Sequence, residues 1–449
     1  MENNMNVLGI SEGFHDAGIC LLKNDSIHFA SHSERHSRKK GDKWLHPTQL
    51  PKTKNNKPDV VAYYEKPFRK NLRRLYAGQK WQTPRFKYDR SFGHHESHAA
   101  AGYYTAPFDT CNVLVIDAIG EWDTMSIWEC DNNKMKKKLT WKYPHSLGLL
   151  YSAITHRIGL KPNEDEYITM GMAAFGEPKY NLENQLWENN HRGVGNIFPE
   201  ARSEDLAASI QSLYERELLK LVELCPHENL VIMGGCALNC VANSKIKGKN
   251  IWIMPCPGDA GSALGAAALV RKKKLKWKHP YLGTLIGRGV NVQEVVKELL
   301  ENKVCGVANG RAEFGPRALG NRSLLGDPRY DIKDTVNNIK QRQKFRPFAP
   351  AILEEYADEY FEGPMNEYMQ FVAKAKHDYN SVTHVDGTAR VQVVKKDCIS
   401  VTRKILEEWY DKTECPMLLN TSLNIKGKPM IDTWDNAVEF SKLYNVKIF

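Results

Sequence analysis

The chain has 449 residues, of which 42% are hydrophobic and 26% charged, and its formal net charge is +10 at pH 7. This composition excludes disordered and collagen-like proteins, and the length allows two to four domains of about 150 residues each. No apolar run reaches about eighteen residues and no basic-then-apolar segment opens the chain, so we expect neither a membrane span nor a secretory signal. Ten cysteines without a CxxC pair are typical of a reduced, cytoplasmic protein.

The first half of the chain alternates between predicted strands and helices. Three β-rich runs, broken by Gly13 and by an Asn-Asp-Ser turn, come first, and two more follow after residue 110. These five predicted strands are residues 6–11, 17–23, 26–32, 112–118 and 124–130. A buried strand, a helix, a strand and a Gly/Ala-rich helix are then expected at residues 229–235, 236–246, 251–255 and 259–270. Such alternation indicates an α/β fold with a covered mixed sheet.

A basic stretch with proline and glycine, residues 271–289, is typical of a domain boundary. Arginine-rich motifs follow it. We therefore predict a first domain at residues 1–280 and a second at 281–449. No internal repeat is visible in the sequence.

Much of the positive charge lies in three patches, at residues 66–90, 134–138 and 271–278. The first patch mixes nine basic residues with aromatic ones. Basic residues interleaved with aromatics indicate nucleic acid or a phosphorylated ligand. The alternative is a solvated face, which we favour for the two short runs.

The stretch "GHHESHAAAGYY" places three histidines within five positions. On a helix, His94 and His98 are separated by one turn and share a face, whereas His95 points elsewhere. Asp117 is expected at a strand end and Asp259 at a helix start, where acids face a cleft in α/β sheets. Two imidazoles and two carboxylates suit ferrous iron, manganese or zinc. The alternative is that Asp117 is a turn residue and Asp259 an N-cap.

Glycine turns and arginines offer candidate sites for phosphate. The turn "GFHDAG" holds His15, a candidate base or donor, and the turn "MGG" precedes a predicted helix. The second domain is rich in cations beside glycine and proline, which favours bidentate clamps on phosphate or carboxylate oxygens over a surface salt-bridge network. These cations are Arg311, Arg317, Arg322, Arg329, Lys340, Arg342 and Arg346. Ser422 and Asn424 in "NTSLN" are polar groups that could complete a nucleotide site with Lys340 and Arg342.

Motifs spread in order over nearly the whole chain resemble the O-carbamoyltransferase family, which includes the nodulation-factor, cephem and aminoglycoside carbamoyltransferases. The shared motifs include His15-Asp16, "ER…K" ending at Lys40, "HHESHAA", "DAIGEWD", "MGMAAFG", "GGCALNCVAN", "GDAGSALGAA", "EFGPRALGNRSLLGDPR", "KFRPFAP" and "NTSLN". The chain is shorter than typical members, so we expect a substrate-shaping insertion to be missing.

The resemblance implies an actin–hexokinase-like first domain, similar to the tRNA threonylcarbamoyl transferase, and a YrdC-like second domain. It implies that the second domain converts carbamoyl phosphate and ATP, with Mg²⁺, into carbamoyl-adenylate. The first domain would then move the carbamoyl group onto an acceptor hydroxyl.

The resemblance also implies roles for individual residues. The metal ligands, usually for iron, would be His94, His98, Asp117 and Asp259. The YrdC-like nucleotide site would use Lys340, Arg342, Ser422 and Asn424. Arg317 and Arg346 would face the carbamoyl phosphate and triphosphate, and His15 and Lys40 would line the transfer site. The adenylate-binding turn would use Gly234, Gly235 and Asn239.

Two residues depart from the family pattern. Ala118 replaces the glycine of D-G-x-G-E, which we expect to alter only the turn, and Ile168 replaces a lysine, which would change the polarity of the acceptor site. For the acceptor we favour a small hydroxylated metabolite or sugar, with a hydroxymethylated pyrimidine, as nucleotide or within nucleic acid, as the second possibility. A different class, an actin-like ATPase or sugar kinase, is disfavoured by the arginine-rich second domain. The sequence gives no oligomeric state.

Overall fold

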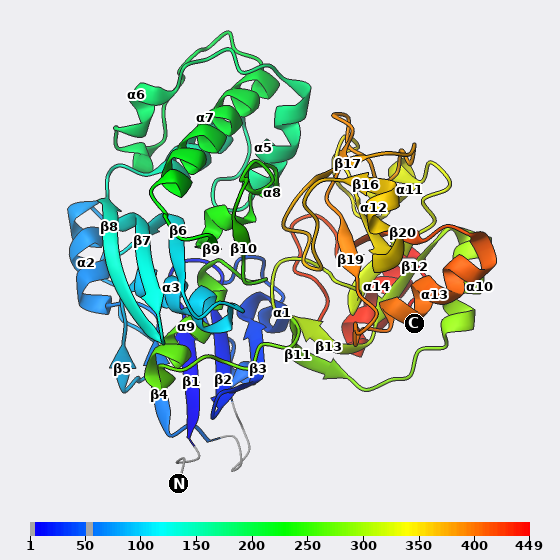
Figure 1. Cartoon of the computed structure of the whole chain (residues 1–449), viewed down its shortest axis with the longest axis horizontal. Coiled ribbons are helices and arrows are strands. Elements are labelled where there is room, and N and C mark those ends of the chain that lie inside the picture. Colours follow the sequence, from blue (N-terminus) through cyan, green and yellow to red (C-terminus); the bar gives the residue numbers. More distant parts are fainter. Residues whose placement is uncertain (1–4, 51–56) are drawn as a thin grey trace. The chain divides into compact units, whose positions relative to one another are not determined.

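The computed structural model describes residues 5–50 and 57–449. The chain divides into two compact units, which are Met1–Ser37 with Gly41–His279, and Arg38–Lys40 with Pro280–Phe449. The division after His279 lies next to the boundary expected at residue 280. Each unit has helices and sheets of its own (Figure 1). Among the described helices, none combines the length and the apolar character that a membrane span needs.

The first unit contains two five-stranded sheets of the same topology. In each sheet the earliest strand is central, the next two lie antiparallel on one side, and two later strands lie parallel on the other. In spatial order one sheet is β3 (Ser26–His32), β2 (Gly18–Lys23), β1 (Asn6–Ser11), β4 (Val60–Tyr63) and β5 (Arg90–Ser91). The other is β10 (Asn250–Trp252), β9 (Asn229–Met233), β6 (Cys111–Gly120), β7 (Asp123–Asp131) and β8 (Lys134–Lys142).

This duplicated strand order is that of the actin–hexokinase-like fold and confirms the fold expected for the first domain. The structure therefore contains a repeat of this sheet that is not visible in the sequence. Sheet topology depends on which segments pair, and many different side chains satisfy the same pairing.

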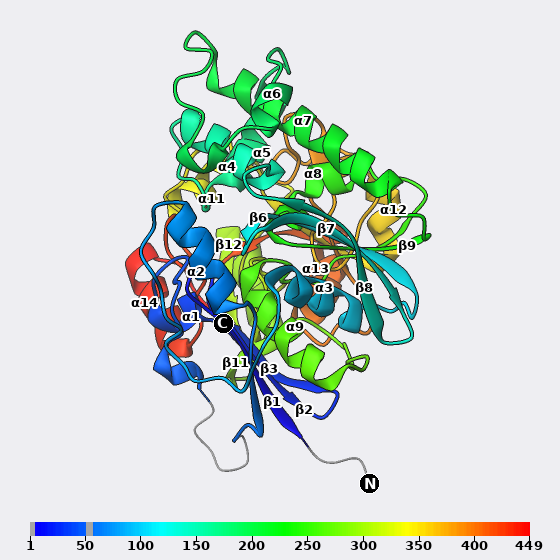
Figure 2. The same ribbon diagram turned by 90° about the vertical axis from the view of Figure 1, so that its left-hand side faces the viewer.

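Two helices lie between the two sheets (Figure 2). The helix α9 (Asp259–Arg271) packs on β1, β2 and β4, whereas α3 (His94–Thr105) packs on β6, β9 and α9. Small residues let α9 approach its neighbours closely: a Cβ atom on Gly9 of β1 would lie only 1.8 Å from the carbonyl oxygen of Ala263. Over the described residues, the other α-helices of the unit are α1 (Ser33–Ser37), α2 (Pro67–Tyr76), α4 (Leu147–Arg157), α5 (Glu166–Met172), α6 (Glu183–Leu186), α7 (Ser203–Glu223) and α8 (Cys240–Asn243).

The second unit is built on a five-stranded mixed sheet, the α/β arrangement expected of a YrdC-like domain. Its order is β12 (Val304–Ala308), β14 (Arg322–Gly326), β20 (Met417–Ser422), β15 (Ala349–Leu353) and β19 (Gln392–Val394). Apolar side chains of α10 (Val292–Asn302) and α13 (Thr402–Thr413) form one core cluster with this sheet. Side chains of α11 (Lys333–Ile339) and α14 (Trp434–Tyr444) belong to a second cluster.

Smaller elements complete the second unit. They are the pair β11 (Tyr281–Ile286) and β13 (Gly310–Glu313), the short helix α12 (Ala357–Tyr360), and the three-stranded sheet β16 (Phe361–Glu362), β17 (Ala373–Ala375) and β18 (Thr388–Ala389).

Candidate functional site

The helix α3 begins at His94, directly after Gly93, whose backbone N–H donates to Glu96 Oε2 at 3.0 Å. His94 and His98 lie one turn apart, and their Nε2 atoms are 3.1 Å from each other. The i, i+4 spacing therefore brings the two rings together as the sequence predicts.

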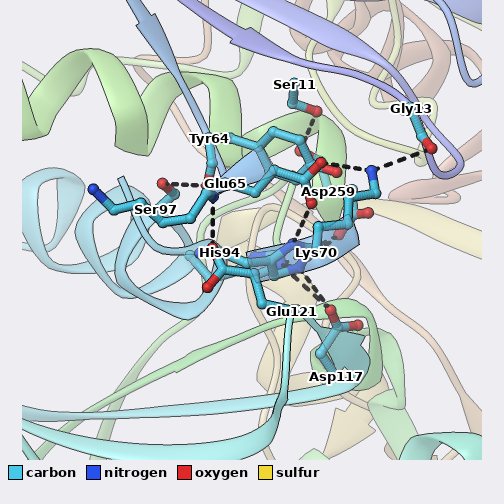
Figure 3. A network of polar contacts seen from close by, with 12 residues as sticks. Ser11, Gly13, Tyr64, Glu65, Lys70, His94, Ser97, Asp117, Glu121 and Asp259 are labelled. Atoms are coloured by element: carbon cyan, nitrogen blue, oxygen red, sulfur yellow. Dashed lines mark hydrogen bonds and ion pairs between the residues drawn. The ribbon is translucent and has the colours of Figure 1, made fainter. Parts of the chain in front are cut away.

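Two carboxylates from other elements close around these imidazoles (Figure 3). Asp117 comes from β6, and Asp259 is the first residue of α9. The sequence predicted that the strand ends near Asp117. β6 instead continues to Gly120, although its pairing with β9 ends at Val115 and its register with β7 shifts after Ile116. The alternative N-cap role of Asp259 is wrong, because Gly258 is the N-cap of α9 and Asp259 lies inside the helix.

The four side chains fit a single metal ion. His94 Nε2 lies 3.0 Å from Asp117 Oδ2 and 3.3 Å from Asp259 Oδ1, and His98 Nε2 also lies 3.3 Å from Asp259 Oδ1. Ligand atoms about 2.1 Å from one ion would be separated by about 3.0–3.4 Å, so these distances suit a shared cation. All four residues are buried, and one donor atom from each lies within 4.8 Å of the others. Mixed nitrogen and oxygen donors suit Fe²⁺, Mn²⁺ or Zn²⁺.

The electrostatics of the cluster favour positive charge. Burial lowers the pKa of His94 and His98, but the adjacent carboxylates of Asp117 and Asp259 outweigh burial and raise both pKa values. Burial raises the pKa of Asp117, yet the two imidazoles outweigh it and hold that pKa well below its usual range. A divalent cation would take the place of the protons that the cluster otherwise retains.

A second set of charged residues, missed by the sequence interpretation, supports His94. Glu65 Oε2 lies 3.9 Å from His94 Nδ1, and Lys70 Nζ lies 2.5 Å from Glu65 Oε1 (Figure 3). Glu121 Oε1 accepts hydrogen bonds from the backbone N–H of His94 at 3.3 Å and of Lys66 at 2.6 Å. Outer carboxylates of this kind orient metal-binding histidines. The signal available in the sequence was the acid that follows the apolar run "VVAYY".

His15 lies in the turn between β1 and β2, half-buried, with Nδ1 3.0 Å from Asp16 Oδ2. Burial opposes its charged form, but the hydrogen bond to Asp16 and the charges of Asp259 and Asp117 raise the pKa of His15 to about 9. Its imidazole therefore experiences the field of the two aspartates of the cluster. Lys40 is exposed and belongs to the short stretch grouped with the second unit, so its place in the transfer site stays a prediction.

The predicted adenylate-binding turn lies beside Asp117. Gly234 has φ +92°, and a Cβ there would lie 2.1 Å from the carbonyl oxygen of Ile116. A Cβ on Gly235 would lie 3.4 Å from Asp117 Oδ1, so this turn borders the His/Asp cluster. Asn239 caps α8 by accepting a hydrogen bond from the backbone N–H of Ala242 at 3.0 Å. The single helix expected at residues 236–246 is wrong, because a 3₁₀ turn and the one-turn α8 form instead.

In the second unit, three of the predicted nucleotide-site residues meet around one ammonium group. Lys340 Nζ donates to the Ser422 carbonyl oxygen, to the Asn424 carbonyl oxygen at 2.9 Å and to Asn424 Oδ1 at 3.1 Å. Burial and the charges of Arg342 and Arg346 hold the pKa of Lys340 well below its usual value. Arg342 lies over the ring of Phe348 at 4.3 Å and donates to Asn337 Oδ1 at 2.7 Å.

The arginines of the second unit have different roles. Arg322 is fully buried and donates to backbone carbonyl oxygens, including those of Thr284, Asn309 and Asp432. Arg329 pairs with Asp327 through two hydrogen bonds of 3.0 and 2.9 Å. The predicted phosphate clamp is therefore wrong for Arg322, which holds the fold together, and stays a prediction for Arg329. Arg317 and Arg346 are half-buried in loops.

Family models match most of the chain. The carbamoyltransferase N-terminus matches residues 51–198 and 188–268, and the carbamoyltransferase C-terminus matches residues 296–449. The chain belongs to the carbamoyltransferase family. It is accordingly a carbamoyltransferase enzyme, and the buried His/Asp cluster lies in elements of the N-terminal family region.

Relatives of this carbamoyltransferase occur in bacteria and archaea. An uncharacterized protein of Synechocystis is 32% identical, with 96% of this chain and 93% of the relative covered. An uncharacterized protein of Methanocaldococcus jannaschii is 30% identical, with 96% of each covered. The nodulation protein NolNO of Sinorhizobium fredii is 32% identical over 77% of this chain and 60% of its own length.

Solved structures resemble this carbamoyltransferase only distantly. Full-length HypF in its phosphate- and nucleotide-bound form is 14% identical, covers 61% of this chain and 56% of its own, and has a TM-score of 0.36. A ROK family glucokinase from Streptomyces griseus is 10% identical, covers 59% of this chain and 98% of its own, and has a TM-score of 0.30. Scores this low carry no argument about function.

Proposed function

We propose that this carbamoyltransferase is an ATP-dependent O-carbamoyltransferase. Water would cleave the P–O bond of carbamoyl phosphate, releasing phosphate and leaving carbamate. A carbamate oxygen would then attack the α-phosphorus of ATP, giving carbamoyl-adenylate and displacing pyrophosphate. An acceptor hydroxyl would then attack the carbamoyl carbon, forming the O-carbamate and releasing AMP. The observation that carries the proposal is the buried cluster of two imidazoles and two carboxylates beside His15, within a chain of this family.

The first unit supplies the groups for the transfer step. A metal ion held by His94, His98, Asp117 and Asp259 would stabilise negative charge on the carbamoyl oxygen. The two aspartates raise the pKa of His15, and neutralising their charge lowers it, so that the imidazole can accept the hydroxyl proton. Gly234 and Gly235 give the adenylate a close approach to this site.

The second unit supplies the groups for the activation step. Burial and the charges of Arg342 and Arg346 lower the pKa of Lys340, so the negative charge of bound phosphate oxygens would restore its charged form. Ser422 and Asn424 hold its ammonium group in place. Arg342 with Arg346 and Arg317 would bind the triphosphate, with Mg²⁺, and carbamoyl phosphate. Adenylation makes physical sense because carbamate by itself is a poor electrophile.

The products test this proposal. The enzyme with labelled carbamoyl phosphate, ATP and a metabolite extract should form AMP and pyrophosphate, and mass spectrometry should find the product that gains the carbamoyl group. Formation of ADP instead would favour the sugar-kinase alternative and refute the proposal. Lys340→Met and Arg346→Ala should each abolish pyrophosphate release while leaving metal binding unchanged. The exposed Lys344→Met, in the same loop, is the matched control.

A further inference from the structure

The helix α2 has its polar face buried and its apolar face exposed. The buried side chains are Lys70, Asn71 and Arg73. The exposed side chains, at positions i, i+4, i+7 and i+8, are Phe68 (65% exposed), Leu72 (44%), Leu75 (52%) and Tyr76 (70%). A surface helix ordinarily buries such a stripe. Figure 1 shows α2 at the periphery of the first unit.

The metal centre explains why the polar face is turned inward. Lys70 binds Glu65, which lies behind His94, and also donates to the carbonyl oxygen of Gly13 at 3.2 Å. Arg73 donates to the carbonyl oxygen of Glu121 at 3.2 Å. The apolar stripe is consequently left on the outside. A contiguous exposed apolar patch of this kind marks an interaction site.

The patch continues from α2 into the segment that follows it, residues 77–90. Trp81 is 50% exposed and its ring lies 6.3 Å from that of Phe68. Gln82 Nε2 donates to the carbonyl oxygen of Gly13 at 2.8 Å, and the backbone N–H of Arg85 donates to Glu12 Oε1 at 2.8 Å. This segment therefore runs along the turn that holds His15.

The charge of this surface selects its partner. Residues 66–90 contain nine basic residues and one acid, and α2 contains no acid. An isologous contact between two copies centred on α2 would place like charges together. Exposed aromatic rings among cations suit stacked bases and phosphates, as in proteins that bind single-stranded nucleic acid.

We propose that the outer face of α2 with residues 77–90, the α2 surface, binds single-stranded nucleic acid and leads a hydroxyl-bearing nucleotide toward His15 and the metal centre. This inference rests on the proposed function, because it names the class of acceptor. The ring of Phe68 lies next to that of Trp81, and the segment that holds Trp81 is hydrogen-bonded to the turn of His15. These contacts, all within the first unit, support the inference.

The binding half of the test uses the full chain and a fluorescein-labelled single-stranded oligonucleotide, with anisotropy measured from about 50 to about 300 mM salt. We expect affinity to fall steeply with salt. Phe68→Ala/Trp81→Ala should weaken binding about tenfold or more, and Arg69→Glu should reduce the salt slope. The controls Trp187→Ala and Lys136→Glu change an exposed aromatic and an exposed cation elsewhere in the first unit and should bind normally.

Several outcomes would overturn the inference. One is that the oligonucleotide does not bind at low salt, and another is that all variants bind it with equal affinity. A third is that Phe68→Ala/Trp81→Ala leaves oligonucleotide binding unchanged and instead loses self-association or binding to anionic lipid vesicles. The second half of the test supplies oligonucleotides whose bases carry a primary hydroxyl. Mass spectrometry then shows whether the oligonucleotide has gained the mass of a carbamoyl group. AMP and pyrophosphate formation without oligonucleotide binding would refute only this inference. Binding without pyrophosphate release would refute the proposed function.

Discussion

Neighbouring histidines in α3 have opposite electrostatic properties. His94 faces the carboxylates, which raise its pKa, whereas burial and the nearby charge of His94 hold the pKa of His95 well below its usual range. His95 Nδ1 lies 2.8 Å from Ser126 Oγ instead. A helical step of about 100° between adjacent residues produces this difference.

We predict that His98→Ala strongly weakens metal binding and abolishes carbamoyl transfer but leaves pyrophosphate release intact. The variant removes one of four ligands, and the carboxylates that remain lose a neutralising partner. We expect metal affinity to fall on the order of 100-fold or more by titration of the metal-free protein. His156→Ala, which changes an exposed histidine, should retain the metal. Equal loss of both activities would contradict separate sites.

The pair of Glu355 and Arg403 predicts how the stability of the second unit depends on pH. Two hydrogen bonds, of 2.6 and 2.9 Å, join the guanidinium and the carboxylate, and Arg403 lowers the pKa of Glu355 to about 2 although partial burial opposes this. Because the folded pKa lies below the unfolded value, the stabilisation is complete above about pH 5 and is lost as pH falls toward 2.

We therefore expect Glu355→Gln to lower the free energy of unfolding by about 1–2 kcal/mol at pH 7, with little effect near pH 2. Urea denaturation at both pH values measures this. Glu407→Gln is the matched control, since Glu407 contacts the same arginine but is half exposed. A pH-independent loss in Glu355→Gln would show that packing, not charge, is responsible.

At the scale of elements, the geometry of the His/Asp cluster depends on the close approach of α3 and α9. A Cβ on Gly265 of α9 would lie 1.7 Å from the carbonyl oxygen of Ser97 in α3. Lys274, in the basic run after α9, donates to the carbonyl oxygen of Tyr103 in the last turn of α3. The solvated-face interpretation favoured for the run at residues 271–278 is therefore wrong for Lys274.

We predict that Gly265→Ala lowers the free energy of unfolding by about 3 kcal/mol or more and weakens metal binding, because the two helices must separate. Thermal unfolding and metal titration measure the two effects. Gly171→Ala, in α5, has no heavy atom within 4 Å of the added Cβ and should be neutral or slightly stabilising. If Gly265→Ala is destabilised but keeps its metal affinity, the site does not depend on the contact between α3 and α9.

The basic run at residues 134–138 lies in β8, the edge strand of the second sheet in the first unit. Lysines on an edge strand discourage pairing with another chain. The solvated-face interpretation is thus supported for this run. In the patch at residues 66–90, some basic side chains are buried against groups around the His/Asp cluster, and the others belong to an exposed surface.

At the scale of the whole molecule, each unit has its own core, so each should unfold separately. We predict two transitions in calorimetry, one raised by Zn²⁺ or Mn²⁺ and the other by ATP. Ligand at about 100 times Kd would stabilise its unit by about 2.7 kcal/mol. In His98→Ala only the metal-dependent shift should disappear. A single transition that moves with both ligands would show that the units unfold cooperatively.

The sequence by itself determined the local features. Helical spacing placed His94 and His98 on one face, β-rich runs gave the opening strands, and ordered motifs indicated the family. Only the tertiary structure decided that Glu65 supports His94, that Arg322 is structural and that α2 turns its polar side inward. Local patterns follow from contacts between neighbours in the chain, whereas these outcomes depend on which distant segments pack together.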